Sequence, residues 1–184
     1  MSAPAVLRRA GGRLRGLARA YAPQEHRPLG GYTAELLGYG ALVGAVALAA
    51  RARRVRLPER LSAADVALLS VATHKLSRLL AKDAVTSPLR APLVRYAEAA
   101  GPGEVNEEVR HPHGGLRHAL AELVTCPFCL GVWIATVLTG GLLVAPRLTR
   151  LAASGLTAVT ASDFLQFAFS AAERCAEPPA SSGT

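Results

Sequence analysis

The chain has 184 residues, which is the size of one domain or of one helical bundle with tails. Hydrophobic residues make up 51% of it, yet 21 Lys and Arg residues oppose 13 Asp and Glu residues, for a formal net charge of +8. Nucleic-acid binding is not expected, because only 5% of the residues are aromatic and no nucleic-acid-binding motif is present. The basic residues instead flank apolar segments, and such flanks usually face the anionic head groups of a lipid bilayer.

The first 50 residues divide into a basic tail and an apolar helix. Residues 1–30 carry six arginines together with Gly and Pro, and are expected to form a flexible tail near lipid. The segment 32–50 has one charge, Glu35 near its start, and is long enough to cross a hydrocarbon core of ~30 Å. Its Gly40 and Gly44 have a spacing that lets membrane helices approach closely, so a homo-oligomer through helix packing is open. A signal peptide is the alternative, but its basic n-region would be unusually long.

A second membrane-embedded helix is predicted over 62–82. Ser62 precedes an apolar-periodic run and Asp65 follows three residues later, which indicates a capping box with Asp in place of Glu. The second half of this helix is basic, so it either crosses the bilayer or enters only part of it. Residues 83–115 are rich in Pro, Gly and mixed charge, and are expected to form the chief hydrophilic loop.

The last part of the chain is expected to be helical as well. A short amphipathic helix over 116–125 would lie at the membrane interface, and apolar helices over 127–146 and 151–172 would be embedded in the bilayer. Pro127 stands at the first position of its helix, where proline is favoured. A polar tail, 176–184, would follow.

These segments predict an all-α integral membrane protein with about four membrane-embedded helices in a domain over 31–175. The distribution of Lys and Arg favours a multi-pass protein with a cytoplasmic N-terminus. Five arginines within 51–60 weaken this orientation, because they would lie on the other side of the membrane.

Two blocks of the sequence carry a family resemblance: 72–96, ATHKLSRLLAKDAVTSPLRAPLVRY, and 115–135, GLRHALAELVTCPFCLGVWIA. They resemble a bacterial membrane-protein family known as domain of unknown function 1360, over about residues 62–172. The matching positions are Lys75, Leu76, Ser77, Arg78, Leu79, Asp83, Thr86, Ser87, Pro88, Leu89, Arg90, Pro92, Glu122, Leu123, Cys126, Cys129, Gly131 and Trp133. Lys75 departs from the Arg that is common in the family, and Ala84 interrupts the usual Asp-Lys pair. The resemblance implies an integral protein of a bacterial inner membrane without established activity, some relatives being labelled sporulation proteins.

Cys126 and Cys129 form the sequence Cys-Pro-Phe-Cys, with Cys126 expected at the N-cap of the helix over 127–146. A redox-active thiol pair is one interpretation, because thioredoxin-like enzymes use this spacing, although their βαβ pattern is absent. Zinc is a second, since tetrahedral zinc needs four ligands and three histidines precede the pair; two protomers could also share their cysteines around one ion. A third is structural, with two small residues easing the start of a helix. The histidines are His111, His113 and His118.

Asp163 is the only charged residue of the predicted helix over 151–172. An ionisable residue inside a membrane helix costs about 2.5–3.5 kcal/mol on insertion scales and normally faces protein or water. We expect Asp163 to pair with Arg78 or His74 of the helix over 62–82, and a proton or ion relay is the alternative.

A third candidate site follows the helix over 62–82 and combines hydroxyl groups with basic side chains. Hydroxyl and guanidinium groups together suit the phosphate of an anionic lipid, whereas the alternative is a proline-terminated helix end with solvated charges. The residues are Lys82, Thr86, Ser87, Arg90 and Arg95.

The sequence as a whole predicts a non-enzymatic membrane protein that acts as a structural or interaction component of the bacterial cell envelope, with a link to sporulation. The first alternative is a thiol-redox or zinc-binding protein at the membrane surface, and the second is a small transporter. No cofactor is expected unless zinc binds, and the expected partners are the lipid bilayer and its anionic head groups.

Overall fold

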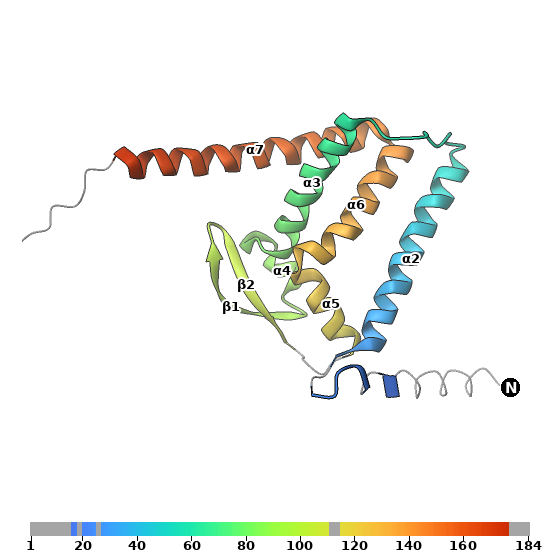
Figure 1. Cartoon of the computed structure of the whole chain (residues 1–184), viewed down its shortest axis with the longest axis horizontal. Coiled ribbons are helices and arrows are strands. Elements are labelled where there is room, and N and C mark those ends of the chain that lie inside the picture. The colour runs from blue at the N-terminus through green and yellow to red at the C-terminus, as the bar shows by residue number, and fades with distance from the viewer. Residues whose placement is uncertain (1–15, 18–19, 25–26, 111–114, 177–184) are drawn as a thin grey trace, which may run out of the picture.

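The computed structural model describes residues 16–17, 20–24, 27–110 and 115–176, so most of the predicted basic tail and residues 177–184 lie outside the description. The described chain is mostly helical and carries one two-stranded sheet (Figure 1). Its elements are α2 (Leu29–Ala52), α3 (Ala63–Ala81), η1 (Ala84–Thr86), α4 (Ser87–Arg90), β1 (Val94–Gly101), β2 (Glu104–Val109), α5 (Leu116–Thr125), α6 (Pro127–Val144) and α7 (Pro146–Ala176).

Helices α2 and α6 run side by side in the same direction. Near their first halves, the rings of Tyr39 and Trp133 meet edge to face with centroids 5.5 Å apart. Further along, a Cβ placed on Gly140 would lie only 2.6 Å from Val46, so glycine allows the close approach of the two helices there. Because the contacting positions advance together in both helices, α2 and α6 are parallel (Figure 1).

Helix α3 runs in the opposite direction to α6. Thr73 lies beside Gly131 near the start of α6, whereas Asp65 in the first turn of α3 binds Arg150, which follows the end of α6. The chain therefore leaves one end of the bundle in α2, returns in α3, and leaves again in α6 (Figure 1).

The core of the molecule lies between α3, α6 and α7, and α2 contributes little to it. Only Gly31 and Ala50 of α2 are buried, and a Cβ on Gly40 or Gly44 would meet nothing within 4 Å. The predicted oligomer through helix packing stays a prediction, with both glycines on an open face. The buried core residues are Leu69, Ala72, Ile134, Leu138, Leu142 and Ala153.

The Ser62 N-cap predicted at the start of α3 is confirmed, but the returning hydrogen bond of the capping box comes from the Ser62 hydroxyl and not from its backbone N–H. The Ser62 hydroxyl accepts a hydrogen bond from the Asp65 backbone N–H at 3.0 Å and donates one to the Asp65 carboxylate at 2.9 Å. The same carboxylate accepts two hydrogen bonds from Arg150 in α7, at 2.8 and 3.0 Å. One acidic residue thus satisfies the helix end and joins α3 to α7.

The prediction of an all-α protein is wrong in one region, because part of the expected loop over 83–115 forms a β-hairpin. Strands β1 and β2 pair antiparallel, with Val94 opposite Val109 and Gly101 opposite Glu104. Pro102 and Gly103 form the turn, and Gly103 has φ +73°, which glycine adopts without steric cost. The ladder has register shifts within β1, so apolar and polar residues do not alternate regularly.

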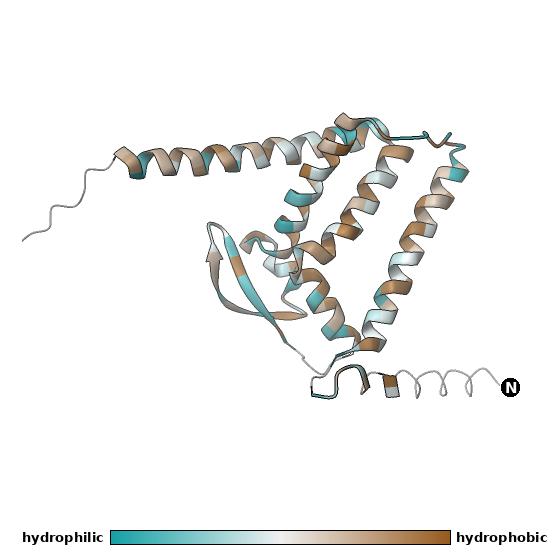
Figure 2. Ribbon diagram, viewed as in Figure 1, coloured by the Kyte–Doolittle hydropathy of each residue, from teal (hydrophilic) through white to brown (hydrophobic). Residues whose placement is uncertain are grey.

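Two helices, α2 and α6, are long and apolar enough to span a membrane (Figure 2). On α2 the large apolar side chains point outward, with Leu36 and Leu37 each 70% exposed. The other two predicted membrane helices, α3 and α7, also form. Within the described chain they are not apolar enough to count as candidate membrane spans, because α3 carries Asp65, Lys75 and Arg78, and α7 is more polar. The count of four membrane-embedded helices is not confirmed.

Candidate functional site

The Cys-Pro-Phe-Cys sequence forms the joint between α5 and α6. Cys126 is the N-cap of α6, as predicted, and its Sγ accepts a hydrogen bond from the Cys129 backbone N–H at 3.3 Å. Pro127 occupies the first helical position, where its missing N–H costs nothing. Cys126 is half-buried, Cys129 is exposed, and both are free thiols. The side chain of Cys126 therefore has a structural task, and the two thiols lie one helical turn apart.

Glu122, one turn before Cys126, ties this joint to the start of α2. Its carboxylate accepts a hydrogen bond from the Tyr32 hydroxyl at 2.5 Å, forms an ion pair with Arg27 at 3.4 Å and lies 3.2 Å from His118 Nε2. The sequence indicated Glu122 only as one of the positions that match the family pattern. Its role as a shared acceptor depends on α2, which is 90 residues away in the chain.

The described residues do not form a complete set of zinc ligands. His118 pairs with Glu122, and no cluster of three or more His, Cys, Asp or Glu side chains with metal-binding geometry occurs in the described part of the chain. His111 and His113 lie outside the described residues.

Arg90 is the most completely bonded side chain at the junction of α3 and the hairpin. Its side chain is 2% exposed and pairs with Glu107 of β2, which is 5% exposed. Arginine has five N–H donors, and here each has an acceptor. These are Glu107 Oε2, Leu80 O, Thr86 Oγ1, Asp83 O and Ser87 Oγ, at 2.5 to 3.2 Å.

The predicted lipid-phosphate site is not assembled in this structure. Arg90 is buried and donates to protein acceptors, with the hydroxyls of Thr86 and Ser87 among them. Arg95 lies on β1, exposed and paired with Glu108 at 2.8 Å, while Lys82 donates to Asn106 at 3.4 Å. The block fixes the hairpin to the end of α3 instead of presenting free charges.

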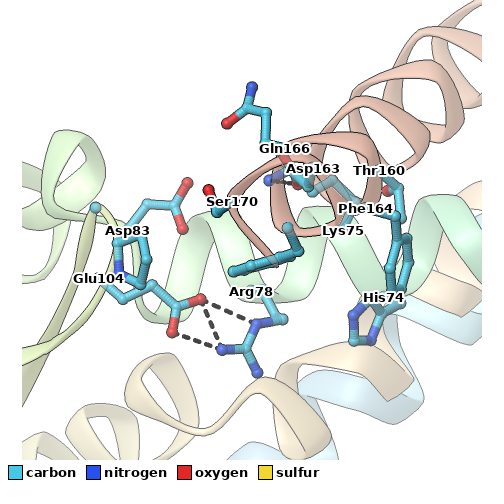
Figure 3. A pocket seen from close by; sticks show the side chains of 13 residues that line it. His74, Lys75, Arg78, Asp83, Glu104, Thr160, Asp163, Phe164, Gln166 and Ser170 are labelled. Atoms are coloured by element: carbon cyan, nitrogen blue, oxygen red, sulfur yellow. Dashed lines mark hydrogen bonds and ion pairs between the residues drawn. The ribbon is translucent and has the colours of Figure 1, made fainter. Parts of the chain in front are cut away.

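A cleft of about 550 Å³ lies between α3, the hairpin turn and α7 (Figure 3). Two ion pairs cross it. Lys75 of α3 donates to Asp163 of α7 at 2.8 Å, and Arg78 of α3 binds the Glu104 carboxylate with both Nε and Nη2, at 3.0 and 2.5 Å. Aromatic side chains of α7, Phe164 and Phe167, complete the lining.

Asp163 is paired, as expected, but the prediction of its partner was wrong. Its partner is Lys75, whereas Arg78 binds Glu104 and His74 lines the same cleft. The helical spacing of α3 placed all three basic residues near one face, but the choice among them depends on the hairpin. Since the hairpin was predicted as a loop, Glu104 was not recognised as a competing acceptor.

Comparison with known proteins agrees with the resemblance carried by the two sequence blocks. The sporulation protein YjcA of Bacillus subtilis is 34% identical to this chain over 71 residues, which cover 38% of this chain and 60% of that relative. The chain thus matches less than two thirds of the relative's length. No solved structure matches the chain. Residues 68–169 match the family model of a protein of unknown function, DUF1360. Because this match covers more than half of the sequence, the chain belongs to the DUF1360 family of proteins of unknown function.

Proposed function

We propose that this protein is a multi-pass membrane protein of the bacterial cell envelope that holds a fixed β-hairpin at the membrane surface as an interaction module. The observation that carries the proposal is the full set of bonds around Arg90, which attaches the hairpin to the end of α3. A buried guanidinium whose donors are all hydrogen-bonded makes the structure around it rigid, so the hairpin is held in one position relative to α3. It leaves the outer surface of the hairpin, such as Tyr96 at 65% exposure, free for a partner.

The direction of the helices supports a third crossing of the membrane. If the parallel helices α2 and α6 both cross the bilayer in the same sense, the chain must return between them, and α3 is the element that connects the two ends. With 19 residues and 1.5 Å of rise per residue, α3 is close to the length that a bilayer needs.

The charges of α3 do not prevent such a crossing, because they have partners within the protein. Lys75 is paired with Asp163, and Arg78 with Glu104. Ionisable residues within membrane proteins normally face the protein interior or a water-filled cavity and pair with one another. Composition alone therefore underestimates α3 as a membrane helix.

The proposed orientation places the N-terminal end of α2 and the hairpin together in the cytoplasm. Both lie at the same end of the bundle, opposite the segment 53–62 (Figure 1). The arginines before α2 favour this side as the cytoplasmic one. The link to sporulation rests on the similarity to the Bacillus subtilis sporulation protein.

Complementation of a deletion strain of the native host tests the proposed role. We expect the Tyr96→Ala variant to reach the membrane in normal amount and to fail in restoring sporulation or envelope integrity. The Cys126→Ser, Cys129→Ser double variant should restore it. Full complementation by Tyr96→Ala, with failure of the cysteine double variant, would contradict the interaction role.

The second candidate function is a thiol-redox or zinc protein, and the pair of free thiols at the start of α6 favours it. Thiol titration and metal analysis of the purified protein would support it if the Cys126–Cys129 pair cycled between dithiol and disulfide, or if zinc bound stoichiometrically. The Cys175→Ser variant is the matched control, because Cys175 lies at the far end of α7. A small transporter is the third candidate, which flux assays in proteoliposomes test.

A further inference from the structure

The cleft between α3, the hairpin turn and α7 contains one acidic side chain, Asp83, whose carboxylate has no partner among the described residues. Asp83 is the N-cap residue of η1, yet its carboxylate makes no capping hydrogen bond. No hydrogen bond or ion pair reaches that carboxylate from elsewhere in the described chain, whereas the other two acids of the cleft are both paired. Figure 3 shows Asp83 on the hairpin side of the cleft, near Glu104.

Hydrogen bonds on both sides of Asp83 fix the backbone that carries this carboxylate. Ala84 N–H donates to Gly103 O at 2.8 Å, and Val105 N–H donates to Lys82 O at 2.9 Å, so Asp83 lies in an isolated bridge opposite Glu104. The Asp83 carbonyl also accepts a hydrogen bond from Arg90 at 3.1 Å. A site held in this way loses little conformational freedom when a ligand binds.

The charge balance of the cleft decides which ligand it suits. The cations Lys75 and Arg78 are neutralised by Asp163 and Glu104, whereas the Asp83 carboxylate has no cationic partner within the described part of the chain. An anionic ligand such as phosphate would therefore have to displace an ion pair and approach a carboxylate.

The other lining residues also favour a positively charged organic group. Phe164 and Phe167 line the cleft from α7 and are 68% and 59% exposed. Aromatic faces attract organic cations, above all quaternary ammonium groups. A volume of about 550 Å³ lies within the usual range of small-molecule sites.

We propose that this cleft binds an ammonium group, with Asp83 as the ion-pair partner and the phenylalanines of α7 as its apolar wall. The ammonium belongs either to a lipid head group or to a free amine, since both present the same chemistry. The proposal does not depend on the envelope role.

Binding of choline to the full-length protein in detergent tests the proposal, with 3,3-dimethyl-1-butanol as the uncharged analogue of the same shape. Saturation-transfer NMR should show saturable binding of choline and none of the neutral analogue. The Asp83→Asn variant should bind choline at least about tenfold more weakly, because the quaternary ammonium group loses the negative charge that it pairs with. The Glu173→Gln variant, which changes an exposed acid of α7 outside the cleft, should bind as the unmodified protein does.

Two further variants separate the site from a loss of folding. Asp83→Glu keeps the charge and should restore much of the binding, and Phe167→Leu should weaken it several-fold while leaving the thermal unfolding temperature nearly unchanged. Equal binding of choline and its neutral analogue would overturn the proposal, as would unchanged binding by Asp83→Asn.

Nanodiscs distinguish the two sources of the ammonium group. If the head group of phosphatidylethanolamine occupies the cleft, discs containing it should weaken choline binding relative to discs of phosphatidylglycerol alone, and Asp83→Asn should abolish that difference. Equal choline binding in both discs assigns the cleft to a free amine. Binding of inorganic phosphate in the cleft, without binding of choline or retention of phosphatidylethanolamine, would overturn the proposal.

Discussion

The guanidinium of Arg90 and the carboxylate of Glu107 form an ion pair inside the protein, with side-chain exposures of 2% and 5%. The remaining N–H groups of Arg90 donate to backbone carbonyl and hydroxyl oxygens, and these hydrogen bonds hold the guanidinium in position. The pair joins the segment after α3 to β2, so it fixes the hairpin relative to the helices.

Removing Arg90 should release the hairpin. We expect Arg90→Ala to lower the free energy of unfolding by about 3–5 kcal/mol, because Glu107 would be left as a buried charge without its partner. Denaturant unfolding in detergent, followed by the fluorescence of Trp133, measures this. Arg95→Ala is the matched control: its pair with Glu108 is exposed, so its loss should cost less than about 1 kcal/mol. Equal effects of the two variants would contradict the structural role of Arg90.

The ion pair of Lys75 and Asp163 should couple α3 to α7. Each single variant, Lys75→Met and Asp163→Asn, should destabilise the protein, and the double variant should lose less than the sum of the two. A double-mutant cycle should give a coupling of about 0.5–3 kcal/mol, the range for residues in direct contact. The same cycle between Asp163 and Arg78 should give a smaller coupling energy. A larger coupling energy would show that Arg78, the partner predicted from the sequence, pairs with Asp163.

The acceptor role of Glu122 should appear in the stability of the joint between α2 and α5. Tyr32→Phe removes the hydroxyl that donates to Glu122 and should cost about 1.5–3 kcal/mol, as hydrogen bonds to charged groups do. Tyr96→Phe is the control, because its ring is exposed on β1 and the change should be almost neutral. Thermal unfolding of both variants in detergent compares them. A neutral Tyr32→Phe would show that the bond does not hold the two helices together.

The carboxylate of Asp65 should join the first turn of α3 to α7. It accepts two hydrogen bonds from Arg150 and one from the Ser62 hydroxyl. We expect Asp65→Ala to lower the thermal unfolding temperature by several degrees, because hydrogen bonds to a charged group are lost. Thermal unfolding in detergent measures this, with Glu173→Ala, which changes an exposed acid of α7, as the control. Equal effects of the two variants would show that Asp65 does not join the two helices.

Local sequence signals predicted the helix ends well. Ser62 with Asp65, and Cys126 with Pro127, are capping arrangements complete within four residues, so the sequence alone indicated them. The hairpin escaped prediction because its strands carry charges on both faces and contain register shifts, although Pro102-Gly103 is a recognisable turn signal.

The partners of the charged residues could not be predicted in the same way. From the sequence alone, Arg90 was expected to bind lipid phosphate. Its true acceptors include backbone carbonyls and a strand residue, which only the folded chain brings near it. Likewise, Arg78 forms its ion pair with Glu104, and Asp163 forms its ion pair with Lys75. These choices depend on tertiary contacts across 17 to 88 residues of the chain.

The position of α3 across the membrane is the central claim, and cysteine accessibility tests it most directly. In a chain whose three native cysteines are replaced by serine, Glu59→Cys lies in the segment before α3 and Ala99→Cys lies on β1. A membrane-impermeant maleimide applied to intact spheroplasts should label Glu59→Cys, and should label Ala99→Cys only after the membrane is permeabilised. Labelling of both positions from the same side would contradict the crossing of α3 and, with it, the multi-pass arrangement proposed for this protein.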